Sequence, residues 1–324
     1  MTPKIQYSVV IPVFRSSHIL ADLLEQLTCQ MDKLGQLYEI IFIEDNGGDN
    51  SWEVLRALLP KYPRVRILKM MRNFGQHNAI MCGFVHSKGE MVITMDDDLQ
   101  NPPEEINKLI ARINEGYDIV YGVPIIKKHH PVRNIGSFLV RTLYKKIFAL
   151  SVNPTSFRII RRKVVEGIVT YDKNFTFIDG LIAWHTTNVG EVGVRHDTRE
   201  AGRSSYSVRK LFVLAMNMLT NFSIMPLQAV SALGLIFSVV GFFLTVAFLV
   251  KYLVWGVPVP GYTSIIVGLT MFSGVQMLSL GLIGEYLGRI HLNINSKPQY
   301  FVSEDLSSSA PPFPGSAKPI NSNI

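Results

Sequence analysis

The N-terminal part of the chain alternates between short apolar runs and amphipathic segments. The apolar runs have the length and β-branched content of strands, and they cover residues 7–14, 38–43, 65–70, 91–95 and 118–121. The segments between them place apolar residues at helical spacing, at 19–27, 51–59, 76–87 and 103–115, and Ser16 and Ser17 can cap the first helix. Continuous apolar strands that alternate with helices predict an α/β domain with a mostly parallel sheet covered on both faces.

Polar residues follow four of these strands, and ligands of parallel sheets bind at the carboxyl ends of the strands. These residues are Pro12 and Phe14 after the first strand, Glu44, Asp45 and Asn46 after the second, Arg72 and Asn73 after the third, and Asp96, Asp98 and Gln100 after the fourth. A carboxylate at the second position can accept hydrogen bonds from a ribose or a base, and a polar turn with a helix cap is the alternative. Neither GxGxxG nor GxxxxGK[ST] occurs, which disfavours a Rossmann cofactor and a P-loop.

Three adjacent carboxylates, Asp96, Asp97 and Asp98, end the fourth strand. In an extended segment the first and third point to the same side, so Asp96 and Asp98 can share one divalent cation, and Gln100 can follow them. Their hard oxygen ligands suit Mg²⁺ or Mn²⁺, with substrate phosphates completing the shell. Asp97 is the carboxylate least expected to touch the metal. The alternative is a solvated acidic turn that caps the helix beginning at Pro103.

The net charge of +7 and the mean hydropathy of +0.22 come from two unlike parts of the chain. No Asp, Glu, Lys or Arg lies between Lys210 and Lys251, or between Lys251 and Glu285. Each stretch exceeds the roughly 20 residues that a membrane-spanning helix needs, which predicts spans near 227–250 and 263–284. A buried core helix is the weaker alternative. Positive charge on both outer sides of the pair predicts cytoplasmic termini.

Two basic segments precede the predicted spans. Residues 127–148 have one apolar and one basic helix face, which favours a helix in the membrane interface over an ordinary surface helix. Residues 195–206 combine Gly, Ser and Arg, as suits capture of a phosphate at the bilayer surface, although topology alone also produces positive charge there. Residues 211–225 are expected to form a second interfacial helix, and Cys29 and Cys82 are expected to be small buried hydrophobes in a reducing compartment.

Together these motifs resemble the membrane-bound family 2 glycosyltransferases of GT-A fold that load a sugar onto polyprenyl phosphate. Such enzymes include bactoprenol glucosyltransferases, undecaprenyl-phosphate aminoarabinose transferases and dolichol-phosphate mannose synthases. The most specific carriers are the Asp-x-Asp-x-Gln run at 96–100 with its Asn-Pro-Pro tail, and the two predicted spans. Further carriers are residues 10–14, 43–49, 72–76, 199–206 and 284–289.

The resemblance implies roles for particular residues. The nucleotide sugar would be held by Pro12, Phe14, Glu44, Asp45, Asn73 and Asp97. The metal would be held by Asp96, Asp98 and Gln100, and catalysis would rest on Asp96, Asp98, Arg133 and Arg199. The acceptor phosphate would meet Arg133, Arg158, Arg199, Arg203 and Ser204.

Three positions depart from the pattern of such relatives. Ser156 stands where they often have Asp before a Phe-Arg pair, and Gly202-Arg203-Ser204-Ser205 replaces a run that ends in Lys. Val123-Pro124 stands where they frequently have Arg. The missing Asp matters little for a phosphate acceptor, because its second pKa near 6 leaves the nucleophilic oxygen largely deprotonated without a general base.

The sequence predicts that the chain consists of four segments. A cytoplasmic GT-A domain covers 1–200, a basic juxtamembrane loop with an interfacial helix covers 201–226, a transmembrane hairpin covers 227–288, and a partly disordered tail covers 289–324. The expected activity is metal-dependent, inverting transfer of a sugar from a UDP-linked donor to undecaprenyl or another polyprenyl phosphate. It would take place at the inner membrane and serve cell-surface glycan synthesis.

Small residues on the spans, such as Gly234 and Gly268, would permit close packing with a second copy or a flippase partner, and no nucleic-acid partner is expected. Two alternatives stay open. A processive polysaccharide synthase is disfavoured because no Q-x-x-R-W motif occurs. A membrane-anchored nucleotide-sugar sensor or scaffold would need a degenerate site.

Overall fold

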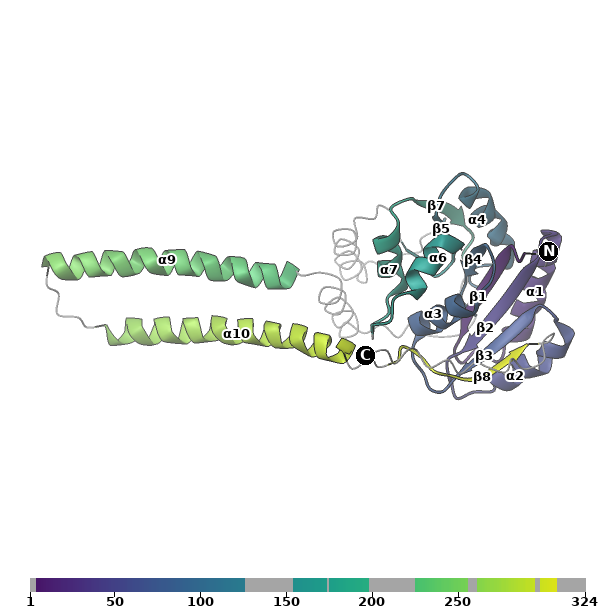
Figure 1. Ribbon diagram of the computed structural model, residues 1–324, viewed down its shortest axis with the longest axis horizontal. Coiled ribbons are helices and arrows are strands. Elements are labelled where there is room, and N and C mark those ends of the chain that lie inside the picture. Colours follow the sequence, from purple (N-terminus) through teal and green to yellow (C-terminus); the bar gives the residue numbers. More distant parts are fainter. Residues whose placement is uncertain are drawn as a thin grey trace, which may run out of the picture. The chain divides into compact units, whose positions relative to one another are not determined.

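The computed structural model describes residues 4–125, 154–173, 175–197, 225–255, 261–294 and 298–307 (Figure 1). The chain divides into two compact units. The first comprises Met1–Ser205 and Pro298–Ile324, and the second comprises Tyr206–Lys297. The segment predicted as a separate tail, 289–324, is therefore shared between the two units.

The first unit is built on an eight-stranded sheet with the order β7-β5-β6-β4-β1-β2-β3-β8 (Figure 1). Its strands are β1 (Tyr7–Val13), β2 (Tyr38–Glu44), β3 (Val65–Met70), β4 (Met91–Thr94), β5 (Ile119–Pro124), β6 (Arg158–Arg161), β7 (Val189–Val194) and β8 (Val302–Ser307). Strands β4, β1, β2 and β3 are parallel neighbours, while β6 is antiparallel to β4 and β5, and β8 is antiparallel to β3. The prediction of a mostly parallel α/β sheet is confirmed, and the carboxyl ends of β4, β1, β2 and β3 share one edge.

Helices cover both faces of this sheet, which explains why the central strands β1 and β4 are buried along their whole length. The helices are α1 (Leu20–Lys33), α2 (Ser51–Leu58), α3 (Gln76–His86), α4 (Ile106–Ile113), α6 (Arg162–Val169) and α7 (Ile178–His185), with short 3-10 helices at Leu59–Lys61 and Pro103–Glu105. Helices α1, α2 and α4 share one buried core with alternate residues of β1 and β2. Helix α3 packs on the other face of β1 and β2, with α6 and α7 beside it.

Helix α3 lies unusually close to the sheet because of Gly83. A Cβ at this position would lie 2.2 Å from Val10 Cγ1 and 2.9 Å from Ile43 Cδ1, so any larger side chain would push the helix away. The close approach fixes the N-terminus of α3 at the carboxyl edge of the sheet. Gly75 precedes the helix with φ 89°, a conformation that glycine adopts without steric cost.

Several elements differ from the sequence predictions. Ser16 does not cap α1, because its hydroxyl donates to Asp97 and lies near Phe14 O, and α1 begins without a side-chain cap. The elements β6, α6, α7 and β7 lie in a region for which the sequence predicts no particular elements. Strand β8 falls within the predicted tail, and its sequence, Val-Ser-Glu-Asp-Leu-Ser, is polar because it lies at a half-exposed edge.

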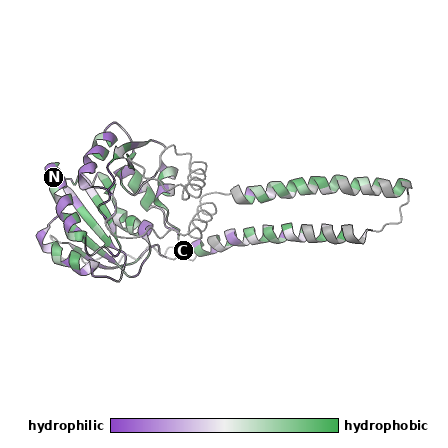
Figure 2. Ribbon diagram, turned by 180° about the vertical axis from the view of Figure 1, so that it is seen from behind, coloured by the Kyte–Doolittle hydropathy of each residue, from purple (hydrophilic) through white to green (hydrophobic). Residues whose placement is uncertain are grey.

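The second unit contains two long helices, α9 (Met225–Trp255, 31 residues) and α10 (Tyr262–Ile294, 33 residues). Apolar residues recur along both (Figure 2), and many of them are exposed, among them Leu235, Phe242, Leu253, Ile265 and Met277. Taken over the residues that the structure describes, no helix reaches the combination of length and apolarity that a membrane span requires. The predicted interfacial helices at 127–148 and 211–225 lie outside the described residues, apart from Met225, which begins α9.

Candidate active site

Five carboxylates gather at the carboxyl edge of the sheet: Asp96, Asp97 and Asp98 after β4, and Glu44 and Asp45 at the end of β2. We call this group the acidic edge. Strand β1 lies between β4 and β2, so the turn after β1 separates the two sets. The convergence predicted from the strand ends is therefore present.

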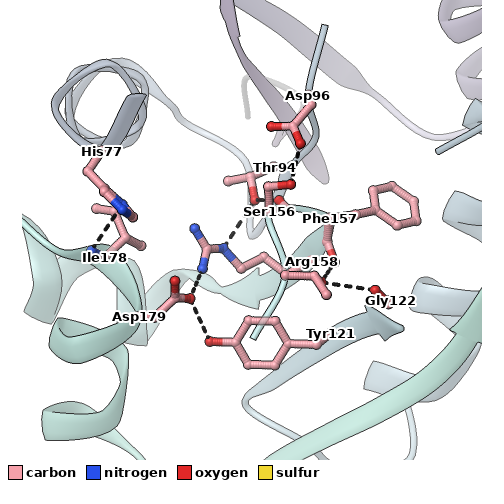
Figure 3. Close-up of polar contacts among 11 residues, drawn as sticks. His77, Thr94, Asp96, Tyr121, Gly122, Ser156, Phe157, Arg158, Ile178 and Asp179 are labelled. Atoms are coloured by element: carbon pink, nitrogen blue, oxygen red, sulfur yellow. Dashed lines mark hydrogen bonds and ion pairs between the residues drawn. The ribbon is translucent and has the colours of Figure 1, made fainter. Parts of the chain in front are cut away.

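Asp96 uses both carboxylate oxygens in hydrogen bonds to neutral side chains. Gln76 Nε2, from the first residue of α3, donates to Oδ1 at 2.7 Å, and Ser156 Oγ donates to Oδ2 (Figure 3). Burial raises the pKa of Asp96 above its usual value, and neighbouring Asp98 raises it further, while the Ser156 hydroxyl opposes the shift. Gln76 and Ser156 therefore stabilise a carboxylate that is poorly solvated.

Asp97 faces a different element from Asp96. Its Oδ2 accepts from Phe14 N at 3.0 Å and from Ser16 Oγ, both in the turn after β1. Burial raises the pKa of Asp97 to about 6, and these two hydrogen bonds oppose that shift. Asp97 thus holds the turn that carries Phe14.

Asp98 and Gln100 form a tight turn, and the end of β7 is held against it. Gln100 N donates to Asp98 Oδ1 at 3.2 Å. Asp197 N donates to Gln100 O at 2.8 Å, and Gln100 Nε2 reaches Asp197 O at 3.5 Å. Two further contacts, Arg195 N to Glu105 Oε2 at 3.0 Å and His196 Nδ1 to Asn101 Oδ1 at 3.3 Å, align residues 195–197 with this turn.

Left-handed backbone is concentrated at the same edge. Among the described residues, the non-glycine residues with positive φ are Arg15 at 59°, Asn46 at 48° and Leu99 at 53°. They follow β1, β2 and β4 respectively. Each such conformation costs roughly 1–2 kcal/mol for a residue with a Cβ, so the surrounding contacts must hold these turns in place.

Asp45 and Glu44 have different surroundings. Asp45 accepts from Phe74 N at 2.7 Å and Gly75 N at 2.8 Å, so it holds the loop before α3. Burial raises its pKa, and these backbone donors oppose the rise. Glu44 Oε1 accepts from Gly47 N at 2.7 Å, whereas Glu44 Oε2 is buried without a protein partner. That orphaned oxygen is an acceptor available to a ligand.

The remaining predicted donor residues lie around these carboxylates. Pro12 is buried within β1, and Phe14 is 45% exposed with the Arg15 guanidinium 5.2 Å from its ring centre. Asn73 is exposed in the loop between β3 and α3. The predicted phosphate-binding residues Arg133, Arg199, Arg203 and Ser204 lie outside the described residues.

Arg158 does not fit its predicted role as a phosphate ligand. Its side chain is 1% exposed and forms an ion pair with Asp179 at the start of α7. Arg158 Nε also donates to Thr94 Oγ1 at 3.2 Å, and the Tyr121 hydroxyl donates to Asp179 at 3.1 Å (Figure 3). A buried guanidinium engaged in this way cannot approach a substrate without breaking the ion pair.

The Arg158 network instead supports Asp96. Thr94 Oγ1 donates to the carbonyl oxygen of Ser156 at 2.5 Å, and the hydroxyl of Ser156 holds Asp96 (Figure 3). Sequence reasoning missed Asp179, whose only signal is a single carboxylate among apolar residues. It noted Ser156 as a departure but did not anticipate its contact with Asp96.

The acidic edge can bind a divalent cation only if a bound ligand supplies some of the coordinating oxygens. Among the described residues, no group of three or more His, Cys, Asp and Glu side chains is arranged to hold a metal ion. Carboxylate oxygens are nevertheless the donors that Mg²⁺ and Mn²⁺ prefer, and a diphosphate can supply the other oxygens. Among the predicted ligands, Asp96 is held in a fixed orientation, because both of its oxygens accept hydrogen bonds from side chains.

The raised pKa of Asp97 predicts a pH-dependent effect of Asp97→Asn. Below the usual value of 3.8 the carboxyl is protonated in both folded and unfolded chains, and above about 6 it is ionised in both. The folded state binds more protons between these values, so wild type loses stability relative to the variant as pH rises through this window. In metal-free buffer, denaturant titrations should show the variant gaining up to about 3 kcal/mol between pH 4 and pH 6, then a plateau. A difference that does not change with pH would contradict the burial of an ionisable Asp97.

The Arg158–Asp179 ion pair predicts strongly non-additive mutations. Asp179→Ala leaves a buried guanidinium without its counter-ion and should lower the free energy of unfolding by about 3–5 kcal/mol. Combining Arg158→Met with Asp179→Leu should cost less than Asp179→Ala alone. As a control, Glu115→Ala removes an exposed ion pair with Arg112 and should cost less than about 1 kcal/mol. Equal losses for the buried and exposed changes would argue against the pairing.

Comparison with known proteins agrees with this geometry. A family model described as "Glycosyl transferase family 2" matches residues 8–169, half of the chain. The fold is similar to that of glucosyl-3-phosphoglycerate synthase from Mycobacterium tuberculosis in complex with Mn²⁺, UDP and glucosyl-3-phosphoglycerate, with a TM-score of 0.50 and 12% identity over 66% of this chain and 77% of that one. Mannosyl-3-phosphoglycerate synthase from Rubrobacter xylanophilus is also similar, with a TM-score of 0.46 and 12% identity over 66% of this chain and 72% of that one. The chain belongs to glycosyl transferase family 2.

Proposed function

We propose that the protein transfers a sugar from a UDP-linked donor to a polyprenyl phosphate at the cytoplasmic face of the inner membrane, with inversion and with a divalent metal ion. The observation that carries this proposal is the acidic edge of a family 2 glycosyltransferase in the same chain as two long helices with many exposed apolar side chains. Different residues would bind the donor, the metal, the acceptor and the membrane.

The donor part of the proposal draws on the turns after β1 and β2. Glu44 Oε2 is an unpartnered buried acceptor that suits a ribose hydroxyl or a base N–H. Phe14 offers an exposed ring beside it in the neighbouring turn. The similar M. tuberculosis enzyme was crystallised with UDP and Mn²⁺, and we propose the same nucleotide and a cation of the same kind here.

The metal part draws on Asp96 and Asp98. A bound cation would neutralise charge on the leaving diphosphate, which is the chemistry it supplies in transfers of this kind. Asp96, Asp98 and Gln100 would hold it, and the hydrogen bonds from Gln76 and Ser156 would orient the carboxylate of Asp96. Phe14, Glu44 and the left-handed turns would meanwhile orient the nucleoside, so that most of the catalytic effect comes from positioning.

The acceptor part rests on charge and on the residue that stands at position 156. Ser156 occupies the position beside Asp96 with a hydroxyl that is already donating to that carboxylate. A phosphate acceptor is largely deprotonated at neutral pH, so it needs no proton acceptor from the protein. Arg199 and Arg203 follow shortly after Asp197, which is bonded to Gln100 at the acidic edge, and we propose that they attract the acceptor phosphate.

The membrane part draws on the complete sequence of the second unit. In the full sequence, residues 211–250 and 252–284 contain no Asp, Glu, Lys or Arg, and this includes positions that the structure does not describe. Helices α9 and α10 cover most of these stretches, and most of the large apolar side chains described on them are exposed. We propose that both helices span the bilayer and so bring the catalytic domain to a lipid-borne acceptor.

A labelled-donor assay tests the function. Purified full-length protein with Mn²⁺ should transfer label from a UDP-sugar, within a panel of nucleotide sugars, to undecaprenyl phosphate, one sugar per lipid. 3-Phosphoglycerate serves as a soluble phosphorylated acceptor and should receive none. Label in phosphoglycerate alone would overturn the lipid acceptor, and a labelled polymer would indicate a processive synthase.

Matched variants connect that assay to the acidic edge. Asp98→Asn should reduce transfer by at least about 100-fold, because it removes a charge that the metal requires. Glu115→Gln, which removes an exposed carboxylate that pairs with Arg112 just after α4, should leave the rate unchanged. Full activity of Asp98→Asn would refute the metal site, and thermal unfolding of each variant would confirm that it is folded.

A further inference from the structure

The C-terminal segment, residues 299–307, crosses the first unit from the loop after α6 to the outer edge of the sheet. At one end Gln299 Nε2 donates to Tyr171 O at 3.0 Å and to Lys173 O at 2.9 Å. At the other end β8 pairs with β3 along its whole length, as Figure 1 shows. A segment more than 230 residues away in the sequence thereby becomes the neighbour of β3.

One charged contact dominates the attachment of β8 to β3. Arg66 donates through Nε to Asp305 Oδ1 at 2.8 Å and through Nη2 to Oδ2 at 2.6 Å. Both side chains are less than a third exposed. Burial acts to raise the pKa of Asp305, but the guanidinium outweighs it and the pKa lies below the usual value. A two-fold contact of this kind is the strongest side-chain pairing available to a short edge strand.

The same segment holds the loop between β3 and α3. Met71 N donates to Phe301 O at 2.9 Å, just beyond the irregular pairing at Lys69 and Met70. Met71 O in turn accepts from Asn46 Nδ2 at 2.9 Å. Met71 is therefore fixed on one side by the C-terminal segment and on the other by the left-handed turn after β2.

This loop leads directly to the acidic edge. After Met71 come Arg72 and Asn73, and then the two amides, Phe74 N and Gly75 N, that donate to Asp45. The loop is thus held at its end by Asp45 and at its start by Phe301 and Asn46. If the contacts of Met71 were lost, Asn73 and the amides of Phe74 and Gly75 would be held only by Asp45.

We propose that the C-terminal segment is a positioning element of the donor site: by holding Met71 through Phe301 and β3 through Asp305, it orders residues 71–75 against Asp45 and Asn46. The inference rests on the proposed function in one respect, that the acidic edge binds the nucleotide. Arg66 and Asp305 act through the loop and do not touch the substrate.

Charge exchange in the full-length protein tests this role. Arg66→Asp and Asp305→Arg should each speed hydrogen exchange at the amides of Phe74 and Gly75, and weaken binding of UDP with Mn²⁺ by about five- to tenfold. Combining the two changes restores opposite charges and should return both readouts to within about twofold of wild type. Glu304→Gln, which removes only an exposed contact of 3.7 Å to Lys69 in the same strand, is the matched control and should change neither.

Unchanged exchange at Phe74 and Gly75 in both single variants would overturn the proposal. So would loss of folded protein with no change in the dissociation constant of the folded fraction, because a merely stabilising strand produces that result. If the single variants do not fold, a chain ending at Lys297 is compared with one ending at Ser307, which keeps β8. Equal UDP affinity and equal exchange in these two chains would also overturn it. If wild type binds no UDP, the donor assignment fails, while amide exchange still tests the segment.

Discussion

Asp96, Asp97 and Asp98 follow one another at the end of β4, so their charges repel one another in a poorly solvated place. This repulsion is offset because each carboxylate accepts hydrogen bonds from different donors. Asp96 accepts from Gln76 and Ser156, Asp97 accepts from Phe14 N and Ser16, and Asp98 accepts from Gln100 N. Because these donors come from the turn after β1, from α3 and from the residues before β6, the elements around the site must be in place together.

The hydrogen-bond donors are held in place by apolar packing and by a buried ion pair. Gly83 lets α3 approach β1 and β2, which places Gln76 at the edge. The buried Arg158–Asp179 pair joins β6 to α7, and Arg158 Nε also donates to Thr94 of β4, whose hydroxyl holds the carbonyl of Ser156. Arg158, a residue expected to bind substrate, thus acts on Asp96 indirectly, through Thr94 and Ser156. The cost of burying its charge explains why Asp179 and Tyr121 accompany it.

Local patterns were sufficient for the parallel part of the fold. The five strands up to Tyr121 and the helices between them follow from apolar runs and helical spacing, and the acidic edge follows from the rule for strand ends. Strands β6 and β8 did not follow, because β6 has only two apolar residues between two arginines and β8 is polar. Both gain their stability from partners distant in sequence. For the same reason the partners of Asp96 and the burial of Arg158 could not be predicted, since they depend on tertiary contacts between separate segments.

Calorimetric titration of UDP into the full-length protein, with and without Mn²⁺, tests most directly whether the acidic edge binds a metal–nucleotide complex. Wild type should bind UDP at least about tenfold more tightly with Mn²⁺, because the carboxylates repel the diphosphate in its absence. The Asp98→Asn variant should lose most of this metal dependence. Equal UDP affinity with and without Mn²⁺ in wild type would contradict a metal-bridged donor site.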